Sequence, residues 1–308
     1  MGGGRRKHMR TTSFLLVFLV SLFLFSQWCE ISYGNDSAHI GRESLIDKHN
    51  TIEEELAKSP SAVPFFIESS TDKNASIVDV YGTMEYPFQS VQSEFLVPTN
   101  WCKILLPHIN VRACTYKKVN ATWLLNSYNV NEFAEPLEDA YQMKFEYLVS
   151  ELQQKYFHIL LNAPDGPFHT KDHRLELEAI PLDQGRTFIH LRYSFGYSAW
   201  VYLVVKLFGG GKTGFTVVGT DSDGNPVYVE GLRGEVERTV VCYYLAILAY
   251  MDTLNDPAEQ RFEKRISRWY DFASRYKKQL IEMGKETYFT SKRQDRTASL
   301  MLQGDLNR

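Results

Sequence analysis

The sequence lacks a strong excess of either charge, with 34 Lys and Arg residues against 37 Asp and Glu residues and a formal net charge of −3. A nucleic-acid-binding surface needs concentrated positive charge, so this balance argues against a nucleic acid partner. Internal repeats and low-complexity linkers are also absent. Apolar residues make up 44% of the 308 residues, which is enough for a sizeable core and predicts one large domain with appendages.

Complete nucleotide-binding and calcium-binding motifs are also missing. The run GGGKTG at 209–214 has Lys206 where a P-loop requires glycine, and a β-type run follows it instead of a helix. The run DSDGN at 221–225 begins like a calcium loop, but Pro226 stands where glycine is required. Both runs are interpreted as turns, so the sequence predicts no cofactor and no metal.

Catalytic signatures are incomplete as well. Gly-x-Ser at Ser198 resembles a nucleophile elbow, but Trp200 replaces the final glycine. His169 and His173 are four residues apart, a spacing that suits zinc only on a helix and with a third ligand. No third ligand is evident, so both histidines are interpreted as surface loop residues. No catalytic residue is predicted.

Residues 1–34 have the features of a targeting segment. Basic residues come first, the apolar run Phe14–Phe25 follows, and small residues at 32–34 offer a cleavage site. We therefore expect an exported protein, periplasmic or secreted. The alternative is an uncleaved membrane anchor through residues 13–28, although the apolar run is shorter than a spanning helix.

Cysteine is scarce, with four residues in the chain. Cys29 would leave with the targeting segment, and Cys242 lies in an apolar run that predicts a buried thiol. Export permits disulfides, so we expect a bridge between Cys102 and Cys114, which on the chain-entropy model would add about 2–3 kcal/mol. The alternative is two buried free thiols.

The rest of the chain is organised around the segment Gly234–Met251, GEVERTVVCYYLAILAYM. Its part Val240–Met251 is uncharged and apolar, and as a helix it would be about 18 Å long, too short to cross a bilayer core. A helix that is apolar on every side must be covered by protein.

Strands that could cover this helix lie in the middle of the chain. Apolar and polar residues alternate with a period of two over 141–149, His173–Ile180 and Arg186–Phe195. Consecutive strands with one polar face predict an antiparallel sheet covered on one side. His190 and Arg192 fall opposite the apolar face of their strand.

The remaining segments are bounded by proline, glycine or polar residues. They predict, in chain order, a surface helix over about Glu43–Lys58, a hairpin of Val63–Glu68 with Ser76–Met84, a short helix after Pro87, a second over Trp101–Leu106, a helix over Tyr197–Phe208, and an amphipathic helix within 258–286.

This order resembles the START-like (SRPBCC, helix-grip) superfamily. The segment YPFQSVQSEFLVPTNWCKILLPHINV is similar to its strand-to-helix-pair opening, and GEVERTVVCYYLAILAYM to its closing helix. More closely, WCKILLPHINVRAC and GLRGEVERTVVCYYLAILAYM resemble a group of uncharacterised exported bacterial proteins of this type. The resemblance covers about residues 76–252.

The resemblance implies an α+β fold in which a curved antiparallel sheet grips a long C-terminal helix, with an added N-terminal hairpin and an extra C-terminal amphipathic helix. The expected division is a signal peptide at 1–34, a surface helix and linker at 35–62, the START-like domain at 63–252, a helical extension at 253–288 and a disordered tail at 289–308.

The resemblance also implies a cavity between sheet and helix for a lipid or other apolar small molecule, with peripheral membrane contact as a further expectation. The candidate ligand contacts are Tyr193 from the sheet, Arg233 and Glu237 near the helix start, and Tyr244 along the helix. The alternatives are a salt bridge for the charged residues and core packing for the phenols.

Two other functions stay open. One is a cyclase-like or hydrolase-like enzyme on the same fold, which needs a titratable pair inside the cavity. The other is a structural envelope protein whose core is filled, because a fold does not by itself define a function.

Overall fold

The computed structural model describes residues 41–58, 63–133, 135–208 and 212–308. The expected signal peptide at 1–34 and the glycines at 209–211 lie outside these residues. Within the described part of the chain, no helix combines the length and the apolar character that crossing a membrane would require.

Helices and strands alternate in the order that the sequence indicates. The described elements are α2 (Gly41–Lys58), β1 (Phe66–Thr71), β2 (Ala75–Met84), α3 (Phe88–Phe95), α4 (Asn100–Leu105), β3 (Val111–Val119), β4 (Thr122–Asn129), η1 (Leu137–Asp139), β5 (Tyr141–Gln153), β6 (Tyr156–Asp165), η2 (Pro167–His169), β7 (Lys171–Pro181), β8 (Thr187–Gly196), α5 (Ala199–Phe208), β9 (Val217–Thr220), β10 (Pro226–Tyr228), α6 (Gly231–Asp252), α7 (Arg261–Ala273), η3 (Ser274–Tyr276), α8 (Lys277–Leu280) and α9 (Lys285–Leu306).

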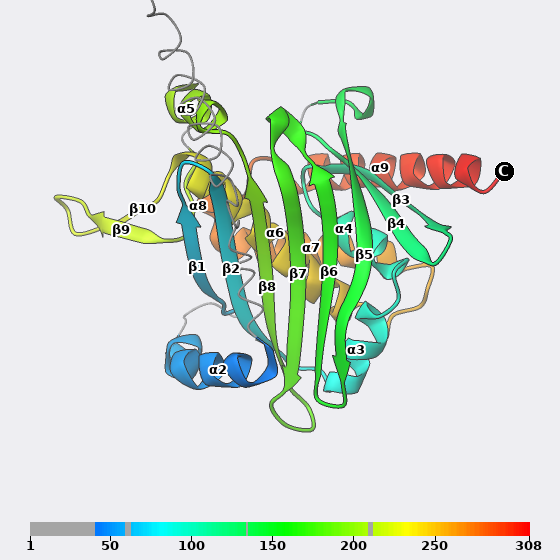
Figure 1. The fold of residues 1–308 in the computed structure, drawn as a ribbon, viewed down its shortest axis with the longest axis horizontal. Helices are drawn as coiled ribbons and strands as arrows, with labels where there is room; N and C mark the ends of the chain where they lie inside the picture. The colour runs from blue at the N-terminus through cyan, green and yellow to red at the C-terminus, as the bar shows by residue number, and fades with distance from the viewer. Residues whose placement is uncertain (1–40, 59–62, 134, 209–211) are drawn as a thin grey trace, which may run out of the picture. The chain divides into compact units, whose positions relative to one another are not determined.

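An antiparallel sheet forms the body of the described chain, in the order β1-β2-β8-β7-β6-β5-β4-β3. Helices α3, α4, α6 and α7 lie on one face of it, which we call the inner face, and Figure 1 looks onto the opposite, outer face. An antiparallel sheet that covers a long helix is the helix-grip arrangement of the α+β class, so the predicted fold class is confirmed.

Helix α6 is covered on two sides, as an apolar helix must be. The sheet lies on one side, and α7 lies on the other, where Trp269 donates a hydrogen bond from Nε1 to the Cys242 carbonyl at 3.0 Å. Val240, Leu245 and Ala246 have no exposed surface. Their complete burial explains why this stretch carries no charge.

The α3–α4 segment that connects β2 to β3 is held by a disulfide and by side chains that bind backbone groups. Cys102 of α4 and Cys114 of β3 are bonded to each other, as predicted. Trp101, which is fully buried, donates from Nε1 to the Phe95 carbonyl at 3.0 Å and so joins α4 to the end of α3. These contacts fix the strand–helix–helix–strand segment over one end of α6.

Tyr244 of α6 packs directly on the backbone of β2. A Cβ atom placed on Gly82 would lie 1.9 Å from the Tyr244 hydroxyl oxygen, and that hydroxyl donates to the Pro64 carbonyl at 3.2 Å. Tyr244 has no exposed surface. Around Tyr244, the space between helix and sheet is filled.

The close approach at Gly82 yields a stability prediction. Gly82→Ala should lower the free energy of unfolding by about 1–3 kcal/mol, because the new methyl group must displace a buried ring. Urea denaturation measures the change. Gly219→Ala is the matched control, since nothing lies within 4 Å of a Cβ atom there. Equal stability of the two variants would show that Tyr244 moves aside freely.

The prediction of a disordered tail at 289–308 is wrong, because this segment forms most of helix α9. Helix α9 lies along β3, which is the edge strand of the sheet. The Ser299 hydroxyl accepts a hydrogen bond from the Cys114 amide at 3.1 Å. The Gln303 side chain accepts from the Tyr116 amide at 2.8 Å and donates to the Tyr116 carbonyl at 3.0 Å.

The physical reason for the error lies in the kind of contact that α9 makes. Its polar side chains pair with the open backbone groups of an edge strand, so the helix needs little apolar character to bind. Lys292, which is fully buried, donates to the His108 and Val111 carbonyls at 2.7 and 2.8 Å. The amphipathic helix expected within 258–286 is also shorter than predicted and ends at Ala273.

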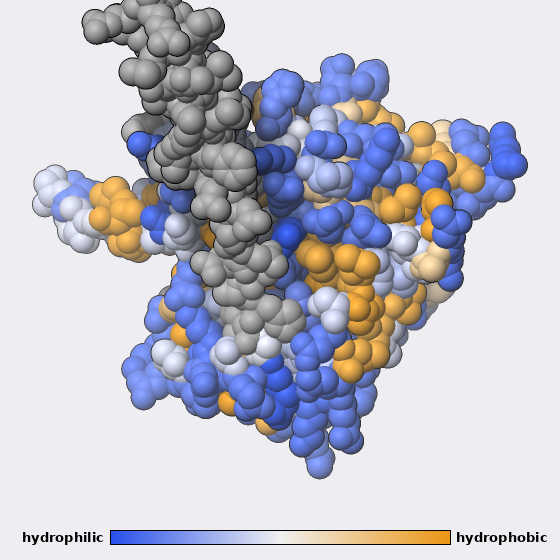
Figure 2. Space-filling model, viewed as in Figure 1, coloured by the Kyte–Doolittle hydropathy of each residue, from blue (hydrophilic) through white to orange (hydrophobic). Residues whose placement is uncertain are grey.

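The outer face of the sheet is partly covered by α2, whose Leu45, Ile52 and Leu56 are buried. The surface helix predicted over about Glu43–Lys58 is therefore confirmed as a helix that packs on the domain. Figure 2 shows this face as largely hydrophilic, with apolar areas at the centre and right of the view and on the β9–β10 hairpin. Leu148 and Leu152 of β5 are exposed apolar side chains.

Candidate functional site

A network of charged side chains lies on the outer face of the sheet. His190 of β8 is almost fully buried, with Nε2 2.7 Å from Asp79 of β2 and Nδ1 2.8 Å from Glu178 of β7. Arg192 contacts Asp79 at 3.3 Å. The alternation predicted that His190 and Arg192 point away from the apolar face, and their contacts with these outer-face groups confirm it.

The chemistry of this network is that of a structural ion cluster. Burial alone would lower the pKa of His190, but hydrogen bonds to Asp79 and Glu178 raise it above its usual value. Burial alone would raise the pKa of Glu178, yet hydrogen bonding to His190 and their charge attraction bring it down to about 2. Both ring nitrogens of His190 are engaged, so this histidine offers no lone pair to a substrate.

Arg233 and Glu237, two of the predicted ligand contacts, meet each other at the start of α6. Their Nε and Oε1 atoms are 3.5 Å apart, and Arg233 donates from Nε to the Ser69 hydroxyl at 2.7 Å. Glu237 has no exposed surface. Its carboxylate accepts hydrogen bonds from the Ser69 hydroxyl, the amides of Phe215 and Thr216, and the Thr216 hydroxyl.

Through these contacts, Arg233 and Glu237 hold the segment before β9 against α6. The Phe215 and Thr216 amides lie 2.6 and 2.9 Å from the carboxylate, and hydrogen bonds to a buried charge are among the strong ones in proteins. The Glu237 carboxylate is thus fully used by the protein itself. Tyr244, the third predicted contact on the helix, likewise donates to the Pro64 carbonyl and packs against Gly82.

Tyr193, the fourth predicted contact, lies on the inner face of the sheet beside His173 of β7. The Tyr193 hydroxyl is 2.7 Å from His173 Nδ1, and His173 Nε2 is 2.8 Å from the Thr170 hydroxyl. The Thr170 hydroxyl uses its hydrogen to donate to the Pro167 carbonyl, so it must accept from His173 Nε2. Neutral His173 therefore carries its hydrogen on Nε2, and its Nδ1 accepts from the Tyr193 hydroxyl. The interpretation of His173 as a surface loop residue is therefore wrong.

A second pair, His108 and Tyr243, faces the sheet from the α4–β3 connection and from α6. Their ring centroids are 4.4 Å apart. The Asn110 amide donates to His108 Nδ1 at 3.1 Å, so Nε2 carries the hydrogen. Nε2 is buried, and a hydrogen bond from the ring to the Thr239 backbone partly opposes the lowering of the His108 pKa by burial.

The four side chains of these two pairs, which we call the inner polar group, are uncharged at neutral pH. Burial lowers the pKa of His108 to about 3 and that of His173 to about 4. Burial also raises the pKa of the Tyr193 phenol above its usual value, and the Tyr243 phenol adds to this shift. Burial raises the pKa of Tyr243 in the same way.

Tyr193 and Tyr243 nevertheless keep part of their surface accessible. They are strongly desolvated, and they pack against the core between sheet and α6. Side chains that are both deep and partly accessible can contact water or a ligand. Tyr244, the next residue on α6, has no exposed surface, so the packing is closed in its direction and less tight in that of Tyr243.

A row of aromatic rings leads from the inner polar group to α5. Ring centroids are 5.7 Å apart between Tyr193 and Phe195, 5.7 Å between Phe195 and Tyr197, and 6.3 Å between Tyr197 and Tyr202 of α5. Helix α5 also presents Trp200, which is 71% exposed. The helix predicted over Tyr197–Phe208 is confirmed, and it covers the end of this row.

Searches of family models and of curated proteins found no match to this chain. Similar solved structures include a truncated norcoclaurine synthase from Thalictrum flavum, 9% identical over 45% of this chain and 87% of the other, with a TM-score of 0.32. The ZhuI aromatase/cyclase from Streptomyces is 11% identical over 65% and 96%, with a TM-score of 0.32.

Human StAR-related lipid transfer protein 5 is 7% identical over 50% of this chain and 83% of its own length, with a TM-score of 0.28. All three belong to the superfamily of START-like folds that the sequence resembles. Likenesses this weak say nothing of what the chain binds, so its function has to be argued from its own side chains.

Proposed function

We propose that this protein binds an uncharged, largely apolar small molecule, such as a neutral lipid, between the inner face of the sheet and α6. The observation that carries the proposal is the partly accessible surface of Tyr193 and Tyr243 within a strongly desolvated region. Sites for small molecules are mostly apolar with a few placed polar groups, and this region has that composition.

The inner polar group defines the chemistry of the ligand. Tyr193 and Tyr243 present phenolic hydroxyl groups at the partly accessible surface. The Tyr193 hydroxyl donates to His173 and can still accept, and the Tyr243 hydroxyl can donate to a ligand. A ligand with one carbonyl or hydroxyl oxygen would pair with these groups. Both histidines are neutral at pH 7, so a charged head group would find no countercharge in the inner polar group.

Binding fits the inner polar group better than catalysis does. A general base works best when its pKa is near the working pH, and burial holds the pKa of His173 at about 4. The raised pKa of Tyr193 makes its phenol a weak acid. The His173–Tyr193 pair therefore suits hydrogen bonding to a neutral ligand more than proton transfer.

Replacing single phenols on α6 tests this function. Tyr243→Phe should weaken binding of 1-oleoylglycerol roughly three- to tenfold, because one hydrogen bond to the ligand is lost. Tyr244→Phe is the matched control: it removes the neighbouring hydroxyl, which bonds to Pro64, and should leave this affinity unchanged. Titration calorimetry gives both affinities.

Native mass spectrometry of the purified protein provides a second readout for the same proposal. A co-purified neutral molecule that is retained by the Tyr244→Phe protein and reduced in the Tyr243→Phe protein is the expected result. The proposal fails if the wild-type protein neither carries such a molecule nor binds 1-oleoylglycerol, or if both variants bind equally well.

A further inference from the structure

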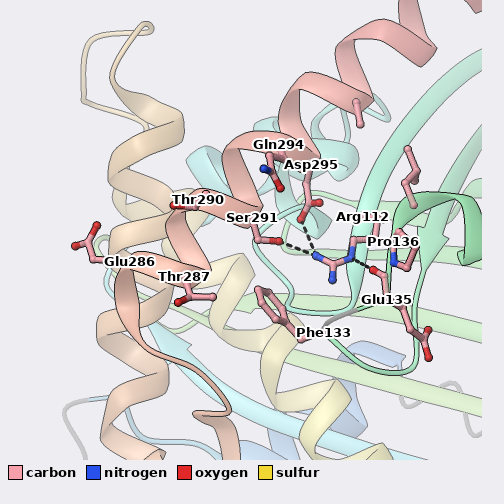
Figure 3. A pocket seen from close by; sticks show the side chains of 12 residues that line it. Arg112, Phe133, Glu135, Pro136, Glu286, Thr287, Thr290, Ser291, Gln294 and Asp295 are labelled. Carbon is pink, nitrogen blue, oxygen red and sulfur yellow. Dashed lines mark hydrogen bonds and ion pairs between the residues drawn. The ribbon is translucent and has the colours of Figure 1, made fainter.

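A cleft lies between the first half of α9 and the residues Phe133, Glu135, Pro136 and Leu137. Its volume is about 710 Å³, which is large enough for a small organic molecule. Hydroxyl and amide side chains of α9 line one wall, among them Thr287, Thr290 and Gln294, and Phe133 lies on the opposite wall (Figure 3).

Arg112 of β3 presents one nitrogen of its guanidinium group to this cleft. Its side chain is only 7% exposed. Nε donates to the Glu135 carbonyl at 3.1 Å, and Nη1 donates to the Ser291 hydroxyl at 2.7 Å, with Asp295 3.6 Å away. The third nitrogen, Nη2, forms no hydrogen bond with any residue that the structure describes, and in Figure 3 no dashed line reaches it.

The buried charges around Arg112 do not balance. Arg112 and Lys292 are both buried, and they share the single carboxylate of Asp295, which lies 2.9 Å from Lys292 Nζ. Burial lowers the pKa of Lys292 to about 8, so it stays largely protonated at neutral pH. A buried surplus of positive charge is unfavourable until an anion pairs with it.

Two more carboxylates, those of Glu135 and Glu286, belong to residues that line the cleft. Figure 3 shows both carboxylates pointing away from the Arg112 guanidinium group, where the Glu135 carboxylate accepts from the Asn131 amide at 3.0 Å and Glu286 is exposed at the start of α9. Phe133 lies against the guanidinium group, with its ring centre 4.9 Å from Arg112 Cζ. Phe133 therefore holds Arg112 in place and offers an apolar surface next to the available nitrogen.

We propose that this cleft binds a small organic carboxylate that carries a ring or other apolar part. The carboxylate accepts a charge-assisted hydrogen bond from Arg112 Nη2, and hydroxyl groups such as that of Thr290 satisfy its other oxygen. The apolar part packs on Phe133. The residues that line this cleft include no member of the inner polar group.

Benzoate is the probe, and benzamide is its uncharged counterpart of nearly the same shape. The full-length protein should bind benzoate saturably and benzamide at least about tenfold more weakly, a difference of about 1.4 kcal/mol. Chemical-shift titration measures both affinities. Inorganic phosphate is the third arm, and phosphate binding as tight as that of benzoate would overturn the assignment to a ring-bearing carboxylate.

Variants on exposed positions of α9 keep the test independent of folding. Gln294→Glu places a negative charge in the cleft and should weaken benzoate binding at least about fivefold. Thr297→Glu adds the same charge to an exposed position of α9 outside the cleft and should leave binding nearly unchanged. Equal effects of the two variants, or no saturable benzoate binding at millimolar concentration, would refute the proposal.

Discussion

Glu237→Ala should destabilise the protein by about 3–5 kcal/mol, one of the largest effects expected for a single substitution in this chain. The carboxylate is fully buried, and its removal leaves the amides of Phe215 and Thr216 without acceptors. Each unsatisfied buried amide adds a penalty of its own. Arg233 also loses its partner at 3.5 Å.

Urea denaturation of Glu237→Ala and of a neighbouring control measures this effect. Glu235→Ala lies two residues away on the same helix, and its only described ion pair, with Lys212, is 3.9 Å long and partly exposed. That variant should lose less than about 1 kcal/mol. Similar losses in both variants would show that the buried carboxylate has no special part in holding residues 214–216 to α6.

Lowering the pH from 6.5 to about 4 should also destabilise the protein by several kcal/mol. The ordinary pKa of histidine is 6.5, whereas folding brings His108 to about 3 and His173 to about 4. Between these values the unfolded chain binds protons that the folded protein does not. The stabilisation is therefore complete above pH 6.5 and is lost as the pH falls towards the folded-state values.

Other groups titrate outside this window or in the opposite direction. The pKa of His190 is raised by Asp79 and Glu178, so its stabilisation is present below pH 6.5 and is lost only as the pH rises through its folded-state value. Glu178, with a pKa of about 2, loses its stabilisation only below its ordinary value of 4.5. Burial raises the pKa values of Glu235 and Asp295, so these two carboxyl groups oppose the trend. The fall in stability between pH 6.5 and 4.5 is thus expected from His108 and His173.

Urea midpoints at several pH values across this interval test the prediction. The wild-type midpoint should fall steadily as the pH decreases. A double variant, His108→Gln with His173→Gln, should begin from a lower stability and show a much smaller slope. An unchanged slope in that variant would mean that other groups carry the acid sensitivity.

Periodicity predicted the antiparallel sheet and the covered helix, and the helix-grip arrangement of the two was implied by the resemblance to the START-like superfamily. The alternation along β8 correctly predicted that Tyr193 and His190 lie on opposite faces of the sheet. The apolar stretch within α6 correctly predicted a helix that is covered by protein. The same alternation extends from Leu175 back to His173, which places this histidine on the inner face. The alternation alone therefore predicts the position of His173. Pairing it with His169, which lies four residues earlier in a loop, led to the wrong interpretation.

The contacts of the other candidate residues could not be predicted in this way. Glu237 binds Ser69, which is 168 residues away in the chain, and no local pattern contains that information. His108 follows a proline after a short helix, and only the folded connection brings it against Tyr243. Helix α9 was missed because its partners are backbone groups, which leave no apolar signature in the sequence.

The position of α9 also has a consequence for the order of events during synthesis. The Tyr116 backbone pairs with Gln303, and 187 residues separate them. At about 5–20 residues per second, a ribosome needs roughly 10–40 s to make that stretch. Throughout this time a nascent chain carries β3 with its edge open to any other strand, so the speed of translation beyond β3 sets the period during which the unfinished protein is most exposed to misassembly.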